Sequence, residues 1–170
     1  CFVSFQEKSQ NVLLETSMSN LMEVDLPEIL EIVKKQSNRD AFKFLKQYQL
    51  DSLNFLVSPF MLLFRRCFSE EKVERLWDSI IVLDRNNEFY SLIRKKNFEL
   101  AFAASVIIFA VPLLKKKIEQ NNSIEQNNEL LLLEIPEIFE SLPIDYVIRV
   151  ALLIENDMPP KNHPRITYSQ

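Results

Sequence analysis

Glycine is absent from this chain of 170 residues. At the usual share of about 7%, roughly a dozen would occur. A P-loop, a dinucleotide-binding G-x-G-x-x-G loop and a G-x-S-x-G nucleophile elbow all need backbone conformations that only glycine adopts readily, so all three are excluded. Hairpins closed by Asn-Gly or Gly-X turns are excluded as well. A glycine-free chain with abundant Leu, Ile, Glu and Lys favours helices.

Histidine and cysteine are also scarce. His163 is the one histidine, and it lies in a proline-rich tail without a neighbouring ligand, so we expect it to be solvent-exposed. We therefore expect no metal site, no cofactor and no histidine-based catalytic triad. Cys1 and Cys67 are too few for a disulfide framework, which favours a reducing, cytoplasmic setting, and an apolar neighbourhood predicts that Cys67 is a packed thiol.

An excess of basic residues is missing too. The net charge is −4, from 20 Lys and Arg against 24 Asp and Glu, so nucleic acid is not expected as a partner. Hydrophobic residues make up 47% of the chain, enough for one folded domain. The first residue is Cys1, and no basic segment precedes an apolar run there, so we expect a fragment of a longer protein and no signal peptide.

Hydrophobic spacing predicts an all-α domain over residues 1–158, with roughly seven to nine helices and no sheet, followed by a polar tail over 159–170. Asp25-Leu26-Pro27-Glu28 predicts a helix start capped by Asp25. Ser58-Pro59 is expected to end one short helix and start another. Ser69-Glu70-Glu71-Lys72 predicts the start of the clearest amphipathic helix. Pro136 and Pro143 are expected to interrupt the last third.

The apolar run over residues 100–114 has two interpretations. A membrane span needs about 20 apolar residues, and this run of roughly 15 contains Pro112. We therefore interpret it as a buried central helix and expect no transmembrane segment. Lys115-Lys116-Lys117 follows it; these lysines could contact an anionic membrane, but a solvated helix end is the simpler interpretation.

One longer pattern surrounds the single tryptophan, Trp77. Leu62-Leu63-Phe64, then Phe68-Ser69-Glu70-Glu71, then Val73 to Ile81 with Trp77-Asp78 at its centre, resembles the C-terminal half of the TBC domain. That family comprises the Rab GTPase-activating proteins. The resemblance extends over about residues 40–157, and the tail around Ile166-Thr167-Tyr168 is similar to the TBC kinase-like subgroup.

The resemblance implies a TBC-like C-terminal helical lobe and a small GTPase of the Rab family as a partner. Its expected core consists of side chains buried together: Phe64, Phe68, Trp77, Ile80, Phe102, Val106 and Phe109. Catalysis in the family uses an arginine finger in I-x-x-D-x-x-R and a glutamine in Y-x-Q. The first motif does not occur here, and Tyr168-Ser169-Gln170 falls after the closing helix, where we interpret it as coincidence.

Two functions remain open from the sequence. The chain is either the C-terminal lobe of a GTPase activator or a non-catalytic TBC-derived scaffold that packs against other protein subunits in a larger assembly. An arginine motif followed by Y-x-Q upstream of Cys1 would favour the activator. In either case the chain alone is expected to be inactive, and the pair Arg65-Arg66 is the candidate partner-binding site, with two solvated arginines as the alternative.

Overall fold

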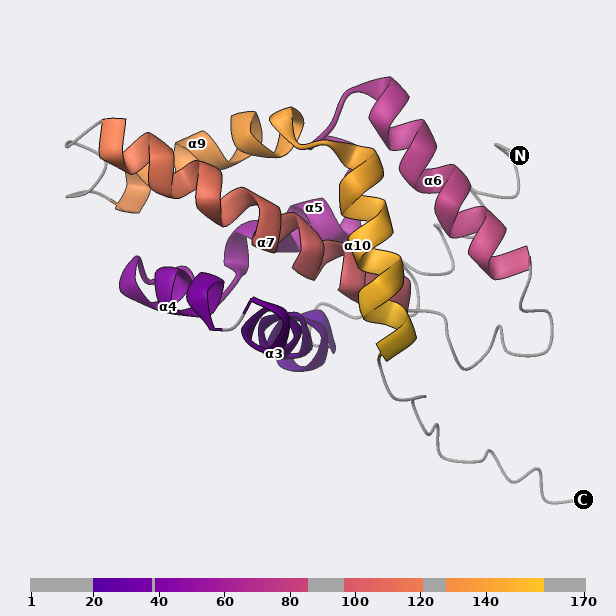
Figure 1. The fold of residues 1–170 in the computed structure, drawn as a ribbon, viewed down its shortest axis with the longest axis horizontal. Coiled ribbons are helices and arrows are strands. Elements are labelled where there is room, and N and C mark those ends of the chain that lie inside the picture. The colour runs from indigo at the N-terminus through magenta and orange to yellow at the C-terminus, as the bar shows by residue number, and fades with distance from the viewer. Residues whose placement is uncertain (1–19, 38, 86–96, 121–127, 158–170) are drawn as a thin grey trace, which may run out of the picture.

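The computed structural model describes residues 20–37, 39–85, 97–120 and 128–157, which form helices joined by short turns (Figure 1). No strand occurs in these ranges, which confirms the all-α class. The elements are η1 (Leu21–Asp25), α3 (Leu26–Gln36), α4 (Asp40–Gln47), η2 (Asn54–Leu56), α5 (Val57–Met61), α6 (Glu70–Arg85), α7 (Asn97–Gln120), α9 (Asn128–Ser141) and α10 (Ile144–Asp157). The seven α-helices among them agree with the expected range.

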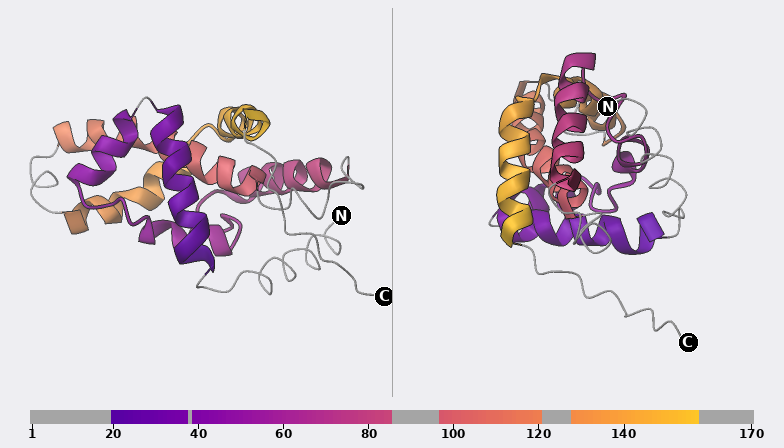
Figure 2. Two further views of the ribbon diagram at one scale, coloured as in Figure 1. Left: turned by 90° about the horizontal axis from the view of Figure 1, so that it is seen from below. Right: turned by 90° about the vertical axis from the view of Figure 1, so that its right-hand side faces the viewer.

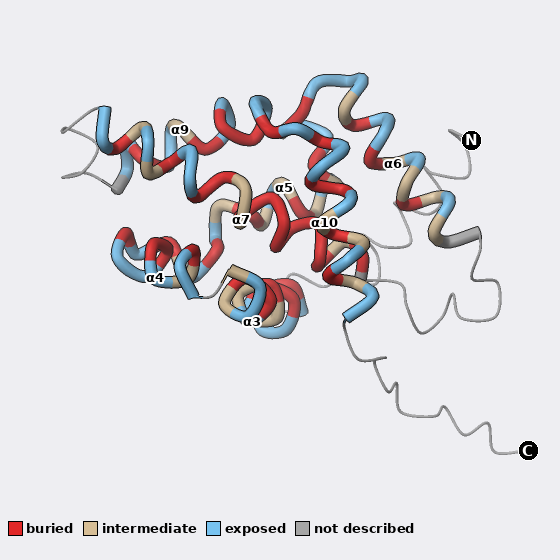
Figure 3. The backbone as a smooth tube through the Cα atoms, viewed as in Figure 1, coloured by how far each residue is buried: buried red, intermediate tan, exposed pale blue. Residues whose placement is uncertain are grey.

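Helix α7 is the central element of the described structure. It contacts α3, α4, α9 and α10, which surround it in the views of Figure 2. Its sequence from Leu100 to Leu114 is apolar on almost every side, and Figure 3 shows the corresponding buried stretch. A helix that is apolar all round needs neighbours on several sides, and these four helices provide them.

Helix α6 begins where the sequence predicts. Its first residue is Glu70, and the Ser69 carbonyl accepts the backbone N–H of Val73 at 2.9 Å. The apolar stripe buries Val73, Leu76 and Ile80. Ion pairs on the polar side connect α6 to α9 and α10.

Arg75 of α6 donates to both carboxylate oxygens of Asp145 on α10, at 2.9 and 3.1 Å. Lys72, also on α6, donates to the backbone carbonyl of Glu140 at the end of α9, and its ammonium lies 3.7 Å from the Glu140 carboxylate. Both contacts fix the position of α6, although exposed pairs of this kind contribute only about 0–1 kcal/mol each.

One expected cap and two expected interruptions at prolines were wrong. Helix α3 does begin at Leu26, directly after Asp25, but Asp25 makes no side-chain cap hydrogen bond. Asp25 has helical φ and ψ, because the π-helical turn η1 precedes α3 and the N–H of Leu26 bonds to the Leu21 carbonyl. Ser58 and Pro59 both lie inside α5, where a proline in the first turn removes an N–H that has no helical partner anyway. Pro136 does not interrupt α9 but lies within it, as Pro112 lies within α7.

Without glycine, other residues take the left-handed backbone positions. Five described residues have φ between 46° and 67°: Arg39, Gln49, Leu53, Leu63 and Phe64. Gln49 closes α4 in a Schellman motif, since its N–H bonds to Lys46 and the N–H of Leu50 bonds to Leu45. Leu63 closes α5 in the same way. The N–H of Leu63 donates to the Phe60 carbonyl, and the N–H of Phe64 donates to the Pro59 carbonyl.

Candidate functional site

The candidate site is the turn over residues 62–67, which joins α5 to α6; we call it the arginine turn. Leu63 and Phe64 are consecutive left-handed residues, with φ of 46° and 60°. A left-handed conformation costs a non-glycine residue about 1–2 kcal/mol, so surrounding contacts must hold this turn in place.

Aromatic packing fixes the inner side of the arginine turn. The Phe64 ring meets the Phe102 ring of α7 edge to face, with centroids 5.0 Å apart. Phe68 packs against both rings at 6.2 Å, and Phe98 lies 6.2 Å from Phe102. Phe64, Phe68 and Phe102 are all buried. Edge-to-face pairs contribute about 0.5–1.5 kcal/mol beyond their burial, which offsets part of the backbone strain.

Trp77 fixes the outer side of the arginine turn. Its indole N–H donates to the carbonyl oxygen of Leu63 at 3.2 Å, so the α6 helix is bonded to the left-handed residue itself. Trp77 is half-buried and packs against the core, in contrast to the burial that we expected.

The other members of the expected core differ in how far they are buried. Ile80 and Val106 are buried together with the aromatic cluster, whereas Phe109 is half-buried and packs at the edge of the core. Phe109 lies next to Ile108 on the one stripe of α7 that its described neighbours cover incompletely. The sequence could not show that stripe, because α7 is apolar on nearly every side.

Arg65 and Arg66 follow directly after the strained pair, and both are exposed. The Arg65 backbone N–H bonds to the Leu62 carbonyl at 3.0 Å, so the turn itself is ordered. Neither guanidinium forms an ion pair with a residue in the described ranges. The arrangement thus presents two cationic groups to solvent from a turn held on both sides, and it suits contact with carboxylates of a partner.

Cys67 completes the turn and is half-buried. Burial raises the pKa of its thiol from 9.0 to about 11, so the thiol is protonated at neutral pH. A protonated thiol is a poor nucleophile, and this agrees with a packed rather than a reactive cysteine.

The three lysines at the end of the apolar run have different surroundings. Lys115 donates to Asp40 at 2.7 Å, which ties α7 to the start of α4. Lys117 lies 2.9 Å from Glu134 and 3.2 Å from Glu137 on α9, and the hydrogen bonds of these two carboxylates raise its pKa. Lys116 is exposed. Two of the three charges therefore hold helices together and are not simply solvated.

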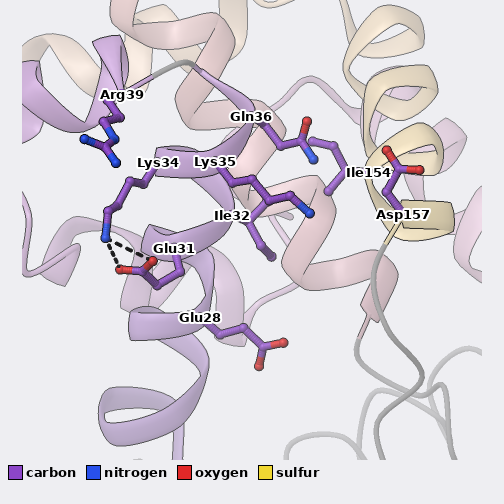
Figure 4. A pocket seen from close by; sticks show the side chains of 9 residues that line it. All are labelled: Glu28, Glu31, Ile32, Lys34, Lys35, Gln36, Arg39, Ile154 and Asp157. Atoms are coloured by element: carbon purple, nitrogen blue, oxygen red, sulfur yellow. Dashed lines mark hydrogen bonds and ion pairs between the residues drawn. The ribbon is translucent and has the colours of Figure 1, made fainter.

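A groove of ≈ 450 Å³ lies between α3 and the end of α10 (Figure 4). Six of its nine lining residues carry a charge, but most of the surface that faces the groove is apolar; the nine residues are Glu28, Glu31, Ile32, Lys34, Lys35, Gln36, Arg39, Ile154 and Asp157. Lys34 is paired with Glu31, three residues earlier on the same helix α3, at 2.9 Å.

No group of three His, Cys, Asp or Glu residues that could hold a metal ion occurs in the described ranges, and His163 lies outside them. One helix, Phe98–Gln120, is long and apolar enough to cross a membrane, but 67% of its apolar window is buried against other helices. A buried core helix meets the same criteria of length and composition.

The fold and the turn define an all-helical domain that displays a basic loop beside a tryptophan-bearing helix. A family model for the Rab-GTPase-TBC domain matches residues 1–109, which include the arginine turn, Trp77-Asp78 and the first half of α7. Because this match covers more than half of the chain, the protein belongs to the Rab-GTPase-TBC domain family. No curated protein and no solved structure matches the chain.

The family match and the resemblance in the sequence overlap over residues 40–109 but have different bounds. The match begins at residue 1, well before the expected residue 40, and ends at 109 instead of 157. Domains of this family act in Rab GTPase activation and generally bind Rab GTPases. Residues 110–157 lie outside the match, although in the structure they pack directly on the matched part through α9 and α10.

Proposed function

We propose that this chain is the C-terminal part of a cytoplasmic Rab GTPase-activating domain, one that supports GTPase binding without supplying the catalytic arginine and glutamine. One observation carries the proposal. The chain matches the family model, but its sequence contains no I-x-x-D-x-x-R motif and no Y-x-Q motif before Trp77-Asp78. Activation needs both side chains, because the arginine neutralises charge on the transferring phosphate and the glutamine positions the attacking water.

The surroundings of two described arginines, Arg75 and Arg149, support this proposal. Arg75 is bound to Asp145 and lies 3.8 Å from Glu71, and the Arg149 guanidinium lies over the Tyr146 ring. A finger must instead be free to reach a phosphate. Of the exposed arginines on the family-matched part, Arg65 and Arg66 stand together, and we propose that they contact acidic residues of the GTPase.

The first experiment tests catalysis. In a single-turnover assay with a panel of GTP-loaded Rab proteins, the 170-residue chain is expected to leave the rate of hydrolysis unchanged. An arginine finger accelerates hydrolysis by about 10³–10⁵, so its presence would be obvious. Stimulation that disappears when one arginine is replaced by alanine would contradict the proposal. The same assay on the longest polypeptide that the gene encodes separates an activator from a non-catalytic scaffold.

The second experiment tests binding by the arginine turn. Arg65→Ala/Arg66→Ala is expected to weaken binding to a GTP-loaded Rab protein by roughly threefold to tenfold, the usual worth of exposed ion pairs. Lys35→Ala/Lys116→Ala is the matched control, since it removes the same charge from two exposed positions elsewhere. Titration measures both affinities. Equal affinities of the wild type and the Arg65/Arg66 variant would mean that the arginine turn is not part of the interface.

A second function is favoured by the outer face of α9. Leu130, Leu132 and Leu133 are exposed there, Leu133 by 74% of its surface. Neighbouring apolar side chains on a surface often mark contacts with other proteins. We therefore keep the alternative of a scaffold that packs against other subunits. Leu132→Glu/Leu133→Glu should release such subunits in a pull-down from the native source, while GTPase binding is retained.

A further inference from the structure

Helix α4 has two contrasting sides. Its inner side buries Ala41, Phe44 and Leu45 against the core. Lys43 and Lys46 are exposed on the other side, and Phe42, one turn before Lys46, is half-buried. The exposed Arg39 directly precedes the helix, and its carbonyl accepts the Lys43 N–H at 2.9 Å. We call Arg39, Phe42, Lys43 and Lys46, together with Lys34 of α3, the cationic face.

Lys34 joins this face through the Phe42 ring. The Lys34 ammonium lies 5.5 Å from the ring centroid, and the Lys46 ammonium lies 5.6 Å from the same centroid. Cations at this distance are attracted to the face of an aromatic ring. Two helices thus bring positive charges together around one half-buried phenyl group. Helices α3 and α4 lie side by side along one edge of the molecule (Figures 1 and 2).

The charge of the cationic face is largely uncompensated. Arg39, Lys43 and Lys46 form no ion pair with any residue in the part of the chain that the structure describes, and only Lys34 is paired, with Glu31 at 2.9 Å. The cations that connect helices are instead bound to carboxylates; they are Lys72, Arg75, Lys115 and Lys117. In a chain of net charge −4, this local excess of positive charge calls for an external anionic partner.

We propose that the cationic face docks onto the surface of an anionic lipid bilayer. Three of its four charges are lysines, and protein interfaces are depleted in lysine and enriched in arginine. Lysine is a compact, strongly hydrated charge on a flexible stem, which suits mobile headgroups and does not require a fixed partner geometry. Phe42 adds an apolar ring to the cationic face, and such a ring can insert into the headgroup region of a bilayer.

Sedimentation of the full chain with lipid vesicles tests this proposal. The wild type should bind vesicles that mix phosphatidylserine with phosphatidylcholine, should not bind phosphatidylcholine alone, and should dissociate as salt is added. Lys43→Ala/Lys46→Ala should partition roughly thirtyfold more weakly, given the contribution of each lysine near an anionic surface. Lys43→Arg/Lys46→Arg keeps the charge and should retain binding.

The matched control is Lys116→Ala/Arg149→Ala, which removes the same charge from two exposed positions outside the cationic face and should change lipid binding by less than about twofold. Circular dichroism of each variant shows whether the helices are intact. The proposal is overturned if the wild type stays in the supernatant, if it binds phosphatidylcholine equally well, or if the control loses as much binding as the Lys43/Lys46 variant. It is also overturned if the arginine-for-lysine variant binds no better than the alanine variant.

Discussion

At the scale of single residues, left-handed backbone conformations at residues other than glycine lower the free energy of unfolding. Gln49 and Leu63 hold the position after a helix end that glycine usually takes, because glycine lacks the Cβ that clashes there. Each non-glycine residue in this conformation costs about 1–2 kcal/mol. The chain therefore keeps strain at its helix ends that a substitution can remove.

Gln49→Gly is expected to raise the free energy of unfolding by about 0.5–1 kcal/mol, since the relief of strain exceeds the greater entropy of glycine in the unfolded chain. Gln49 is exposed and its side chain is not needed in the core. Leu53→Gly is the control: φ is equally positive at 54°, but the side chain is fully buried, so stability should fall by about 2–5 kcal/mol. Urea denaturation measures both, and a loss of stability in Gln49→Gly would contradict the strain.

Cys67 gives a prediction about pH. Its pKa rises from 9.0 to about 11 on folding, so its contribution to stability is fully present below pH 9 and is lost as pH rises through 11. The sign follows because the unfolded chain releases the thiol proton first and then binds fewer protons than the folded chain. In a Cys1→Ser background, the folded protein should react with iodoacetamide far more slowly at pH 9 than the urea-unfolded protein does. Equal rates would mean that the thiol is not protected.

At the scale of elements, two long helices contain a proline. Pro112 and Pro136 lie inside α7 and α9, where each removes one backbone hydrogen bond. Both side chains are exposed, so neither is needed to fill the core. We infer that surrounding contacts, and not local propensity, keep these helices continuous.

Pro112→Ala should therefore stabilise the protein by about 1–3 kcal/mol, because it restores a hydrogen bond and removes a steric clash in α7. Pro59→Ala serves as the comparison, since Pro59 lies in the first turn of α5 and should change stability by less than about 0.5 kcal/mol. Thermal unfolding of both variants provides the measurement. An unchanged melting temperature for Pro112→Ala would show that the helix is already distorted around the proline.

Sequence patterns predicted the elements unequally. The start of α6 and the apolar character of α7 followed from capping residues and local spacing, which are properties of neighbouring residues. The cap at Asp25 was wrong because the π-helical turn η1 precedes α3, so Asp25 has helical φ and ψ instead of the non-helical backbone that a cap residue needs. Arg65 and Arg66 could be named as an exposed pair, but the bond from Trp77 to the Leu63 carbonyl depends on two left-handed residues that no propensity indicates.

At the scale of the whole molecule, the core extends beyond the family match. The match ends at Phe109, in the middle of α7, whereas α9 and α10 cover α7 on the far side and bury Phe139, Val147 and Ala151. We propose residues 1–158 as one folding unit for this reason. A boundary at 109 would expose the apolar surface of α7 that these helices cover.

Truncation after Phe109 is accordingly expected to abolish cooperative unfolding, since both the second half of α7 and its covering helices are removed. Truncation after Pro159, by contrast, should leave the urea midpoint unchanged within error, because the described core ends at Asp157. Urea titrations followed by circular dichroism compare the two. A cooperative transition in the shorter fragment would show that the first 109 residues fold on their own.

The bond between Trp77 and the arginine turn also gives the protein an optical reporter. Trp77 is the sole tryptophan of the chain, so all of its indole emission comes from one half-buried ring whose N–H is bonded to Leu63, two residues before Arg65. A partner that shifts the Leu63 carbonyl alters the polarity around that ring. Emission wavelength and quenching by acrylamide would then follow occupancy of the turn without any attached dye, while ligands that bind the opposite end of the molecule leave the spectrum unaltered.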